Sequence, residues 1–304
     1  MKGLALLVMK GRVQAIMSVT VLSLLSLIFA PLSLLGGAAV ALVTLRHGSK
    51  DGLLVVAGST AAAGVLSYLI FKDILPALLF ALALWLPVWL LALLLRFTRS
   101  MALALQAGML MGLLVITYFY LLVGDPAAMW AGILKEPLKV FLENNAALDG
   151  SLSFDELLIS VSRWMTAIMA AGFVMQVAIM LFIARWWQAL LFNPGGFGEE
   201  FRALSFHKGL VFIAVPVLLL VLLSQPPEWV IALSLIVMVA YFIQGLAVTH
   251  CLLKSMNANI VWIVGIYVLL VIAMPYVMSA LAMTGLTDAW MDFRRKTRTA
   301  SSED

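Results

Sequence analysis

Long runs of apolar residues, separated by short polar turns, constrain this chain more than any other feature. The run Ile260–Met283 has about 24 residues, enough for a helix to cross a hydrocarbon core of ~30 Å. In the whole chain 64% of residues are hydrophobic and 11% are charged. Soluble domains contain roughly 45–50% apolar and about 25% charged residues. We therefore expect an all-α polytopic membrane protein, built as one transmembrane helical bundle.

The apolar runs predict eight or nine hydrophobic segments. These are Val13–Ala30, Leu32–Leu45, Leu53–Phe71, Leu75–Leu95, Met101–Val123, a helix from Ser153 to about Phe192, Leu210–Leu223, Trp229–Leu253 and Ile260–Met283. Leu32–Leu45, of about 14 residues, is short for a crossing, so whether it crosses fully stays open. Gly285 can adopt the left-handed conformation that ends helices, so we expect a helix end there.

Three parts follow from this pattern: a six-segment bundle (1–192), three further segments (193–285) and a charged tail (286–304). The long loop 124–155 contains Asp125-Pro126, a cap followed by proline, which predicts a helix start. Lys135 and Lys139 lie opposite apolar residues at helical spacing, so this helix is amphipathic. Such a helix lies flat on the membrane or, alternatively, covers a cavity as a lid. Ser153 and Glu156 form a capping box, which predicts the next helix start.

The distribution of Lys and Arg predicts a cytoplasmic N-terminus, because cytoplasmic loops retain these residues. This rule also accounts for the net charge of +4 without nucleic acid. The side of the tail stays open, since nine crossings would place its basic residues outside. A fold-back of the last segment near Pro275 is one alternative. The cytoplasmic side would hold Arg12, Arg46, Arg96 and Arg185, and the opposite side Lys72, Lys135, Lys139 and Arg163.

The sequence favours a protein without enzymatic activity. It contains no recognisable nucleophile–base pair, no carboxylate dyad within an apolar segment and no phosphate-binding motif of an ATPase. Cys251 is the single cysteine, and the three histidines lie in separate segments, so we expect no metal and no cofactor. Ionisable residues are nearly absent from the middle of the apolar segments, which argues against a proton-driven pump. Gln106, Gln176 and Gln244 are the main polar side chains there, and we interpret them as interhelical hydrogen-bond partners.

Candidate solute-binding residues gather near the predicted outer face. Aromatic walls with a few polar groups suit a small planar solute. The alternatives are an ordinary interfacial belt of aromatic residues and an ion pair of Arg163 with Asp155 or Glu156. The candidates are Tyr118, Tyr120, Trp130, Asn144, Arg163 and Trp164.

Two further sets of residues are candidates for helix packing or partner contact. Ala104, Gly108 and Gly112 form a strip of small residues that allows close helix approach, either within the bundle or against a partner. In the tail, Asp288, Asp292, Arg294 and Arg295 permit contacts three and four residues apart. They form either a structured membrane anchor or a docking epitope.

Two passages carry a resemblance to a known family. They are Leu45-Arg46-His47-Gly48-Ser49-Lys50-Asp51-Gly52, and Gly245–Lys254 together with the ending Gly285–Arg295. The chain resembles the YybS-like family of uncharacterised bacterial inner-membrane proteins. The first six segments of that family are similar to the substrate-binding S components of energy-coupling-factor transporters. The last three segments and the tail have no counterpart in such subunits, which puts docking to a shared energy module in doubt.

The resemblance implies a protein of the bacterial inner membrane that binds a small solute and requires a separate energising partner. The alternative is a scaffold or assembly protein that acts through its helix faces and tail. A cavity lined by polar and aromatic residues from several helices would favour the first function. A solid bundle with a groove along Ala104, Gly108 and Gly112 would favour the second.

Overall fold

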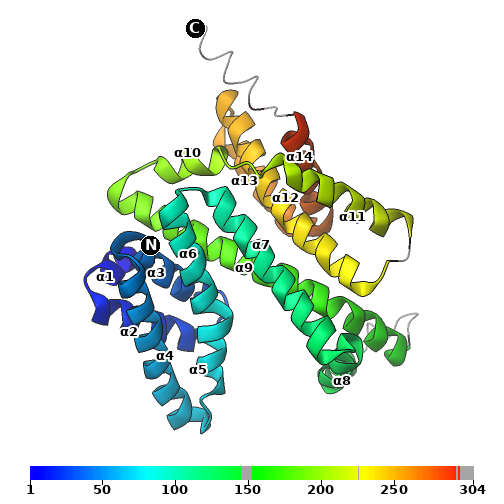
Figure 1. Cartoon of the computed structure of the whole chain (residues 1–304), viewed down its shortest axis with the longest axis horizontal. Helices are drawn as coiled ribbons and strands as arrows, with labels where there is room; N and C mark the ends of the chain where they lie inside the picture. Colours follow the sequence, from blue (N-terminus) through cyan, green and yellow to red (C-terminus); the bar gives the residue numbers. More distant parts are fainter. Residues whose placement is uncertain (145–152, 225, 292–293, 295–304) are drawn as a thin grey trace.

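The computed structural model describes residues 1–144, 153–224, 226–291 and 294, and all regular secondary structure in them is helical. The expectation of an all-α bundle is confirmed (Figure 1). The first half contains α1 (Lys2–Met9), α2 (Arg12–Leu25), α3 (Leu32–His47), α4 (Ser49–Phe71), α5 (Leu75–Phe80), the π-helix η1 (Ala81–Trp85), α6 (Leu86–Thr98), α7 (Met101–Tyr118), the π-helix η2 (Phe119–Val123) and α8 (Pro126–Asn144). The second half contains α9 (Phe154–Phe192), α10 (Gly196–Arg202), the 3-10 turn η4 (Lys208–Leu210), α11 (Val211–Leu223), α12 (Glu228–Ser255), α13 (Ile260–Ile272) and α14 (Met274–Met291).

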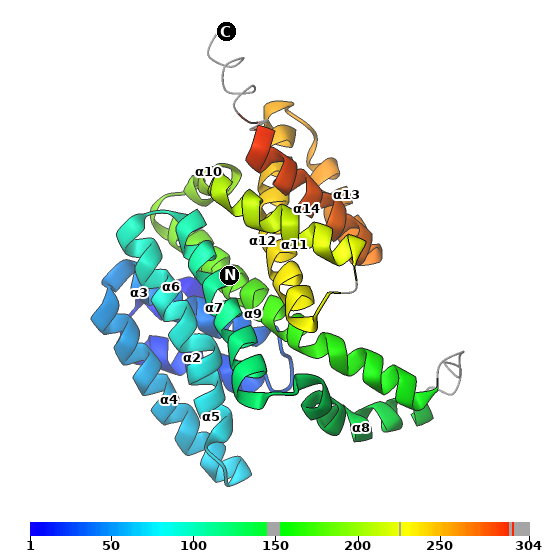
Figure 2. The ribbon, with the colours of Figure 1, turned by 45° about the vertical axis from the view of Figure 1, so that its right-hand side comes forward.

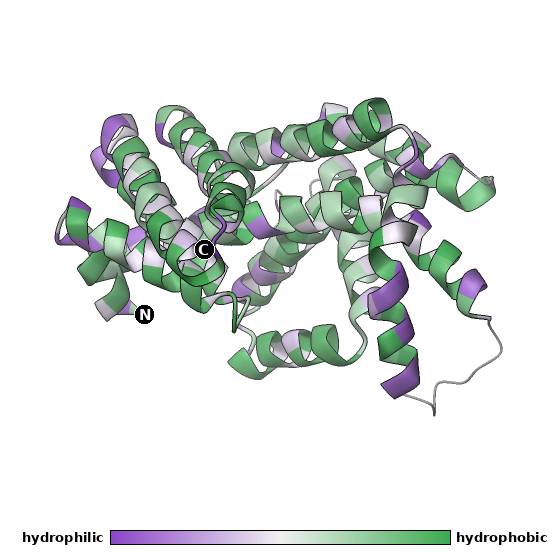
Figure 3. Ribbon diagram, turned by 90° about the horizontal axis from the view of Figure 1, so that it is seen from below, coloured by the Kyte–Doolittle hydropathy of each residue, from purple (hydrophilic) through white to green (hydrophobic). Residues whose placement is uncertain are grey.

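Five helical segments of the described chain are long and apolar enough to cross a membrane. They are Ser49–Phe71, Leu75–Thr98, Met101–Val123, Phe154–Phe192 and Glu228–Ser255. Shorter apolar helices accompany them at Arg12–Leu25, Leu32–His47, Lys208–Leu223 and Ile260–Ile272. Figure 3 shows apolar residues along most of the helical surface, as expected of helices that face lipid.

The two predicted helix starts around loop 124–155 are confirmed. The Asp125 side chain accepts a hydrogen bond from the Ala128 N–H at the start of α8. Ser153 and Glu156 form the complete capping box that begins α9. With 39 residues, α9 is about 58 Å long at 1.5 Å per residue, which exceeds the hydrocarbon core. Its first turns therefore extend beyond the bundle, with α8 packed alongside (Figure 2).

Contacts between arginines and distant segments define one end of the bundle, which we call the basic end. Arg12 forms an ion pair with Asp51 at 2.6 Å. The Arg96 guanidinium donates to the Leu45 carbonyl at 2.6 Å. The Arg46 guanidinium lies 4.1 Å from the centre of the Phe192 ring. The starts of α2 and α4 and the ends of α3, α6 and α9 therefore lie together.

The helices α2 and α3 form a short hairpin that enters from the basic end. They have 14 and 16 residues, or about 21 and 24 Å, both less than the ~30 Å hydrocarbon core. Their turn, which includes Ala30 and Pro31, shares a cavity with Gly172 and Ile179 in the middle of α9. Leu32–Leu45 therefore does not complete a crossing. Because α2 also stops short, the pair returns to its own side and the direction of every later helix is unchanged.

The predicted single segment Ile260–Met283 is wrong, because the chain breaks at Ala273 into α13 and α14. The alternative, a fold-back near Pro275, is confirmed. Pro275 lacks an N–H and restricts the residue before it, so a continuous helix is disfavoured there. The expected helix end at Gly285 is also wrong. Gly285 lies inside α14, where a Cβ would collide with the Tyr241 carbonyl of α12. The domain boundary predicted at 285–286 therefore falls within a packed helix.

The hairpin α13–α14 explains the charge distribution that nine crossings left unexplained. α13 follows the end of α12, and α14 returns to the same end, where Arg294 donates to the Arg202 and Leu204 carbonyls. In Figures 1 and 2 the end of α14 lies near the end of α12. The five long segments (α4, α5–α6, α7–η2, α9 and α12) and the shorter η4–α11 run between the two ends, and a short hairpin flanks them on each side. Arg12 and Arg294, near the two ends of the described chain, thus both lie at the basic end.

This arrangement predicts that the two ends of the protein face the same side of the membrane. Green fluorescent protein matures only in the cytoplasm, and alkaline phosphatase is active only outside it. Each reporter is fused in turn to the N-terminus and to the C-terminus. The fusions should assign both ends to the same side of the membrane. Nine full crossings would give opposite assignments, and that outcome would contradict the two-hairpin topology.

Candidate functional site

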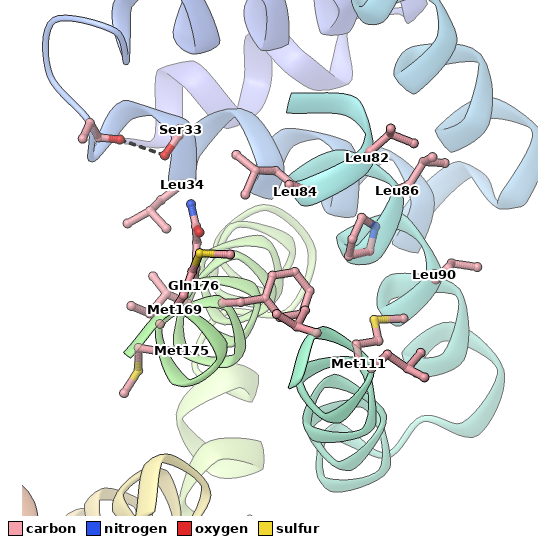
Figure 4. Close-up of a pocket in the computed structure, with 18 of the residues that line it drawn as sticks. Ser33, Leu34, Leu82, Leu84, Leu86, Leu90, Met111, Met169, Met175 and Gln176 are labelled. Carbon is pink, nitrogen blue, oxygen red and sulfur yellow. Dashed lines mark hydrogen bonds between the residues drawn. The ribbon is translucent and has the colours of Figure 1, made fainter. Parts of the chain in front are cut away.

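A cavity of about 980 Å³ lies between α3, η1, α6, α7 and α9 (Figure 4), and we call it the central cavity. Its volume is at the upper end of the ~300–1,000 Å³ typical of small-molecule sites. The lining is almost entirely apolar and includes Leu34, Leu84, Pro87, Met111, Phe173 and Gln176. No residue of α8 lines it, so α8 does not act as its lid in this structure.

Local sequence explains why the helices leave this space open on the α6 side. Pro87 has no N–H to donate to the carbonyl four residues earlier, so the regular α-helical pattern is interrupted. The chain adopts the π-helical turn Ala81–Trp85 just before it. Leu82 and Leu84 of that turn line the cavity together with Pro87. Turns of this kind in long helices occur frequently at functional sites.

The other walls contribute space in two ways. The hairpin α2–α3 stops beside the middle of α9, so no helix fills the region beyond its turn. Gly172 of α9 lines the cavity, and a Cβ added there would meet no atom within 4 Å. Gly37 of α3 behaves in the opposite way, because a Cβ there would collide with Met180. The backbones of α3 and α9 therefore pack closely at Gly37, whereas space remains open at Gly172.

Gln176 supplies the amide of the central cavity, and its position is close to the middle of the membrane. It lies between the interfacial residues Trp164 and Trp186, about 18 and 15 Å away at 1.5 Å per residue. Figure 4 shows its side chain rising from α9 beside Leu34 of α3. The amide forms no hydrogen bond with any residue that the structure describes. An unpaired amide in an apolar medium costs about 1–3 kcal/mol, so this group favours a hydrogen-bonding occupant.

The structure brings two of the predicted solute-binding residues, Tyr120 and Arg163, to the same carboxylate, that of Glu228. Tyr118 is 54% exposed on the outside of the bundle, and Asn144 is exposed at the end of α8. Trp130 donates its indole N–H to Thr166 at 2.9 Å, which ties α8 to α9. Tyr120 interacts electrostatically with Glu228 at the start of α12.

Arg163 and Trp164 lie at the end of the bundle opposite the basic end, beside a separate cavity of about 620 Å³. Arg163 does not pair with Asp155 or Glu156 as expected. Its guanidinium instead forms an ion pair with Glu228 at 2.9 Å, because the start of α12 lies beside this turn of α9. None of the six predicted residues lines the central cavity. The sequence indicated Gln176 only as an interhelical hydrogen-bond partner. Pro87, which interrupts a helix beside the cavity, is a sequence signal that could have pointed to it.

The similarity of this chain to a known protein family extends over most of its length. A family profile described as a predicted membrane protein (DUF2232) matches residues 13–289, which is most of the chain. The chain belongs to the DUF2232 family. Neither a curated protein nor a solved structure matches it. The matched range of this DUF2232 protein covers almost all of both short hairpins and every residue that lines the central cavity.

The small-residue strip of this DUF2232 protein is covered by its own helices. Ala104 and Gly108 are buried, and a Cβ at Gly108 would contact Leu91 of α6 and Val177 of α9. A Cβ at Gly112 would press against Val174 of α9 and Ile236 of α12. The strip therefore brings α6, α9 and α12 close to α7, and its surface is not exposed to a partner.

The described residues of the predicted tail epitope form a buried polar cluster. Asp288 and Arg294 form an ion pair at 2.7 Å, with side chains 1% and 7% exposed. Gln244 of α12 donates to the Gly285 carbonyl at 3.0 Å and to Asp288 at 3.1 Å, and accepts from the Phe206 N–H at 2.9 Å. Asp292 and Arg295 lie outside the described residues. Arg294 reaches back six residues rather than the expected three or four, and the cluster joins α14 to α12 and to the segment before η4.

The described part of the chain contains no cluster of side chains suited to bind a metal ion. There, no group of three or more His, Cys, Asp or Glu side chains is placed to hold an ion. The residues around the central cavity are also unsuited to a metal, because its lining offers hydrophobic side chains, one neutral amide and the Ser33 hydroxyl.

The buried ion pair predicts strongly non-additive effects on stability. Asp288→Leu or Arg294→Met alone should lower the free energy of unfolding by about 3–5 kcal/mol, since each leaves an uncompensated buried charge. The double variant should lose less than the sum of the two. Arg12→Met is the matched control, because the Arg12–Asp51 pair is largely exposed and should contribute no more than ~1 kcal/mol. Denaturant unfolding in detergent measures all four, and additive losses would contradict the interaction.

Proposed function

We propose that this protein binds a small, largely apolar molecule in the central cavity and serves as the solute-binding subunit of a transport system. One observation carries the proposal: a cavity of about 980 Å³ with hydrophobic walls contains an amide that has no partner among the described residues. An amide without a partner in an apolar medium costs free energy. A bound molecule with a hydrogen-bonding group would remove that cost.

The resemblance to the YybS-like family and to S components supports a binding subunit rather than a complete pump. The predicted need for a separate energising partner follows from the absence of an ATP-binding motif in the sequence. Two features differ from an S component: the cavity lies at mid-depth rather than near the outer face, and a second hairpin, α13–α14, follows the six-segment part. The clustering of arginines at one end supports a bacterial inner-membrane protein with a cytoplasmic N-terminus.

The alternative, a membrane scaffold, has one specific observation in its favour. α13 is apolar along its whole length, and none of its residues is buried in the bundle. The side of α13 that does not pack on the bundle is therefore open to lipid or to another membrane protein. Retention of a stoichiometric protein partner that is lost when α13 is altered would support the scaffold.

Filling the central cavity tests the proposal. Gly172→Trp would place a large side chain in open cavity space without a steric conflict at its Cβ. We expect native mass spectrometry of the protein, gently purified from its host membrane, to show a bound molecule of a few hundred daltons in the wild type. In Gly172→Trp the occupancy should fall at least about tenfold, which corresponds to 1.4 kcal/mol.

Gly265→Trp is the matched control. Gly265 lies in α13, away from the cavity, and a Cβ there would also meet no atom within 4 Å. This variant should keep the bound molecule. A wild-type protein without any stoichiometric small molecule, or equal occupancy in both variants, would contradict binding in the central cavity.

A further inference from the structure

The rim of the central cavity faces the hydrocarbon region rather than water. Leu82, Leu114 and Met169 line the cavity and are 64%, 68% and 40% exposed. Leu82 and Leu114 lie well inside the spans Leu75–Thr98 and Met101–Val123, and Met169 lies only five residues beyond Trp164 toward the middle of α9. The opening is therefore lateral, between helices, at a depth where the surrounding medium is lipid.

The chemistry of the lining restricts what can stay there. Hydrophobic side chains provide the contact surface, and the Gln176 amide provides two N–H donors and one carbonyl acceptor without charge. A charged ligand would have to lose its hydration at mid-membrane without a counter-ion in the described lining, at a cost of several kcal/mol. A neutral ligand with one hydrogen-bonding group matches these walls.

The depth of Gln176 also excludes the acyl chain of an ordinary phospholipid as its partner. The polar groups of a phospholipid lie at the interface, about 15 Å from the centre of a ~30 Å hydrocarbon core. Its chains reach the cavity but carry no group that can pair with the amide. The partner must bring a hydroxyl or carbonyl group to the middle of the membrane.

We infer that the ligand is a neutral, bilayer-dissolved amphiphile with a hydroxyl or carbonyl group, and that it enters the central cavity sideways from the lipid. This inference rests on the proposed binding function and names its class of ligand and its route. Its polar group bonds to Gln176, and its apolar part lies against η1, α6 and α7.

Photoactivatable probes in lipid nanodiscs test the route and the class. The two probes are hexadecanol and hexadecanoic acid, each carrying a diazirine at the same chain position and used at a pH where the acid is ionised. Mass spectrometry locates the labelled residues. We expect hexadecanol to label cavity residues of α6, α7 and α9, and hexadecanoic acid to label them much less.

Gln176→Met should reduce cavity labelling by hexadecanol roughly 3- to 10-fold, as expected for the loss of one hydrogen bond. Gln106→Met is the matched control, because Gln106 lies on α7 outside the central cavity. It should leave the labelling unchanged. If Gln176→Met proves unstable, Gln176→Asn keeps the amide but shortens its reach, and it should give a reduction in the same direction.

The possible results distinguish a wrong ligand class or entry route from a wrong binding function. Equal labelling by the two probes, or full labelling of Gln176→Met, would overturn the ligand class. Loss of the natural bound molecule in Gly172→Trp without any cavity labelling by hexadecanol would overturn lateral entry and leave the binding function standing. Absence of a natural bound molecule from the wild type would instead remove the binding function itself.

Discussion

Satisfying the backbone inside a medium without water is the constraint on which this structure depends. Where a helix stops within the hydrocarbon, its N–H and C=O groups need partners from the chain itself. The turn between α2 and α3 meets this need by a chain of close hydrogen bonds from Leu22 to Leu34. This solution allows a hairpin to end at mid-depth. The cavity exists because the hairpin ends there and no helix takes the space beyond it.

Glycine determines where the bundle is closed and where it is open. At Gly245 and Gly285 the backbones of α12 and α14 approach so closely that any Cβ would collide with a carbonyl. This contact brings Asp288 beside Gln244 and lets one cluster hold α14, α12 and the segment before η4. Gly172 has no such neighbour. The same residue type therefore gives tight packing at the last hairpin and free volume in the first part of the bundle.

The sequence was sufficient for features that depend on local chemistry. Apolar runs predicted the long helices, and Ser153 with Glu156 predicted the start of α9, because capping involves residues only three apart. It was insufficient where partners come from distant segments. Gly285 has the properties of a helix end, but close packing on Tyr241 explains its presence, and that contact spans 44 residues. Arg163 had two acidic neighbours in sequence, yet it pairs with Glu228 on another helix.

The central cavity could not be predicted from the sequence, for a further physical reason. Inside and outside positions of a membrane helix are both apolar, so residues facing a cavity cannot be told from residues facing lipid. The three glutamines noted in the apolar segments had the same expected role, as interhelical hydrogen-bond partners. The structure separates two of them: the Gln244 amide bonds to three groups on other segments, whereas the Gln176 amide bonds to none in the described chain. Both amides lie within apolar helices, yet the described chain supplies partners for Gln244 and none for Gln176.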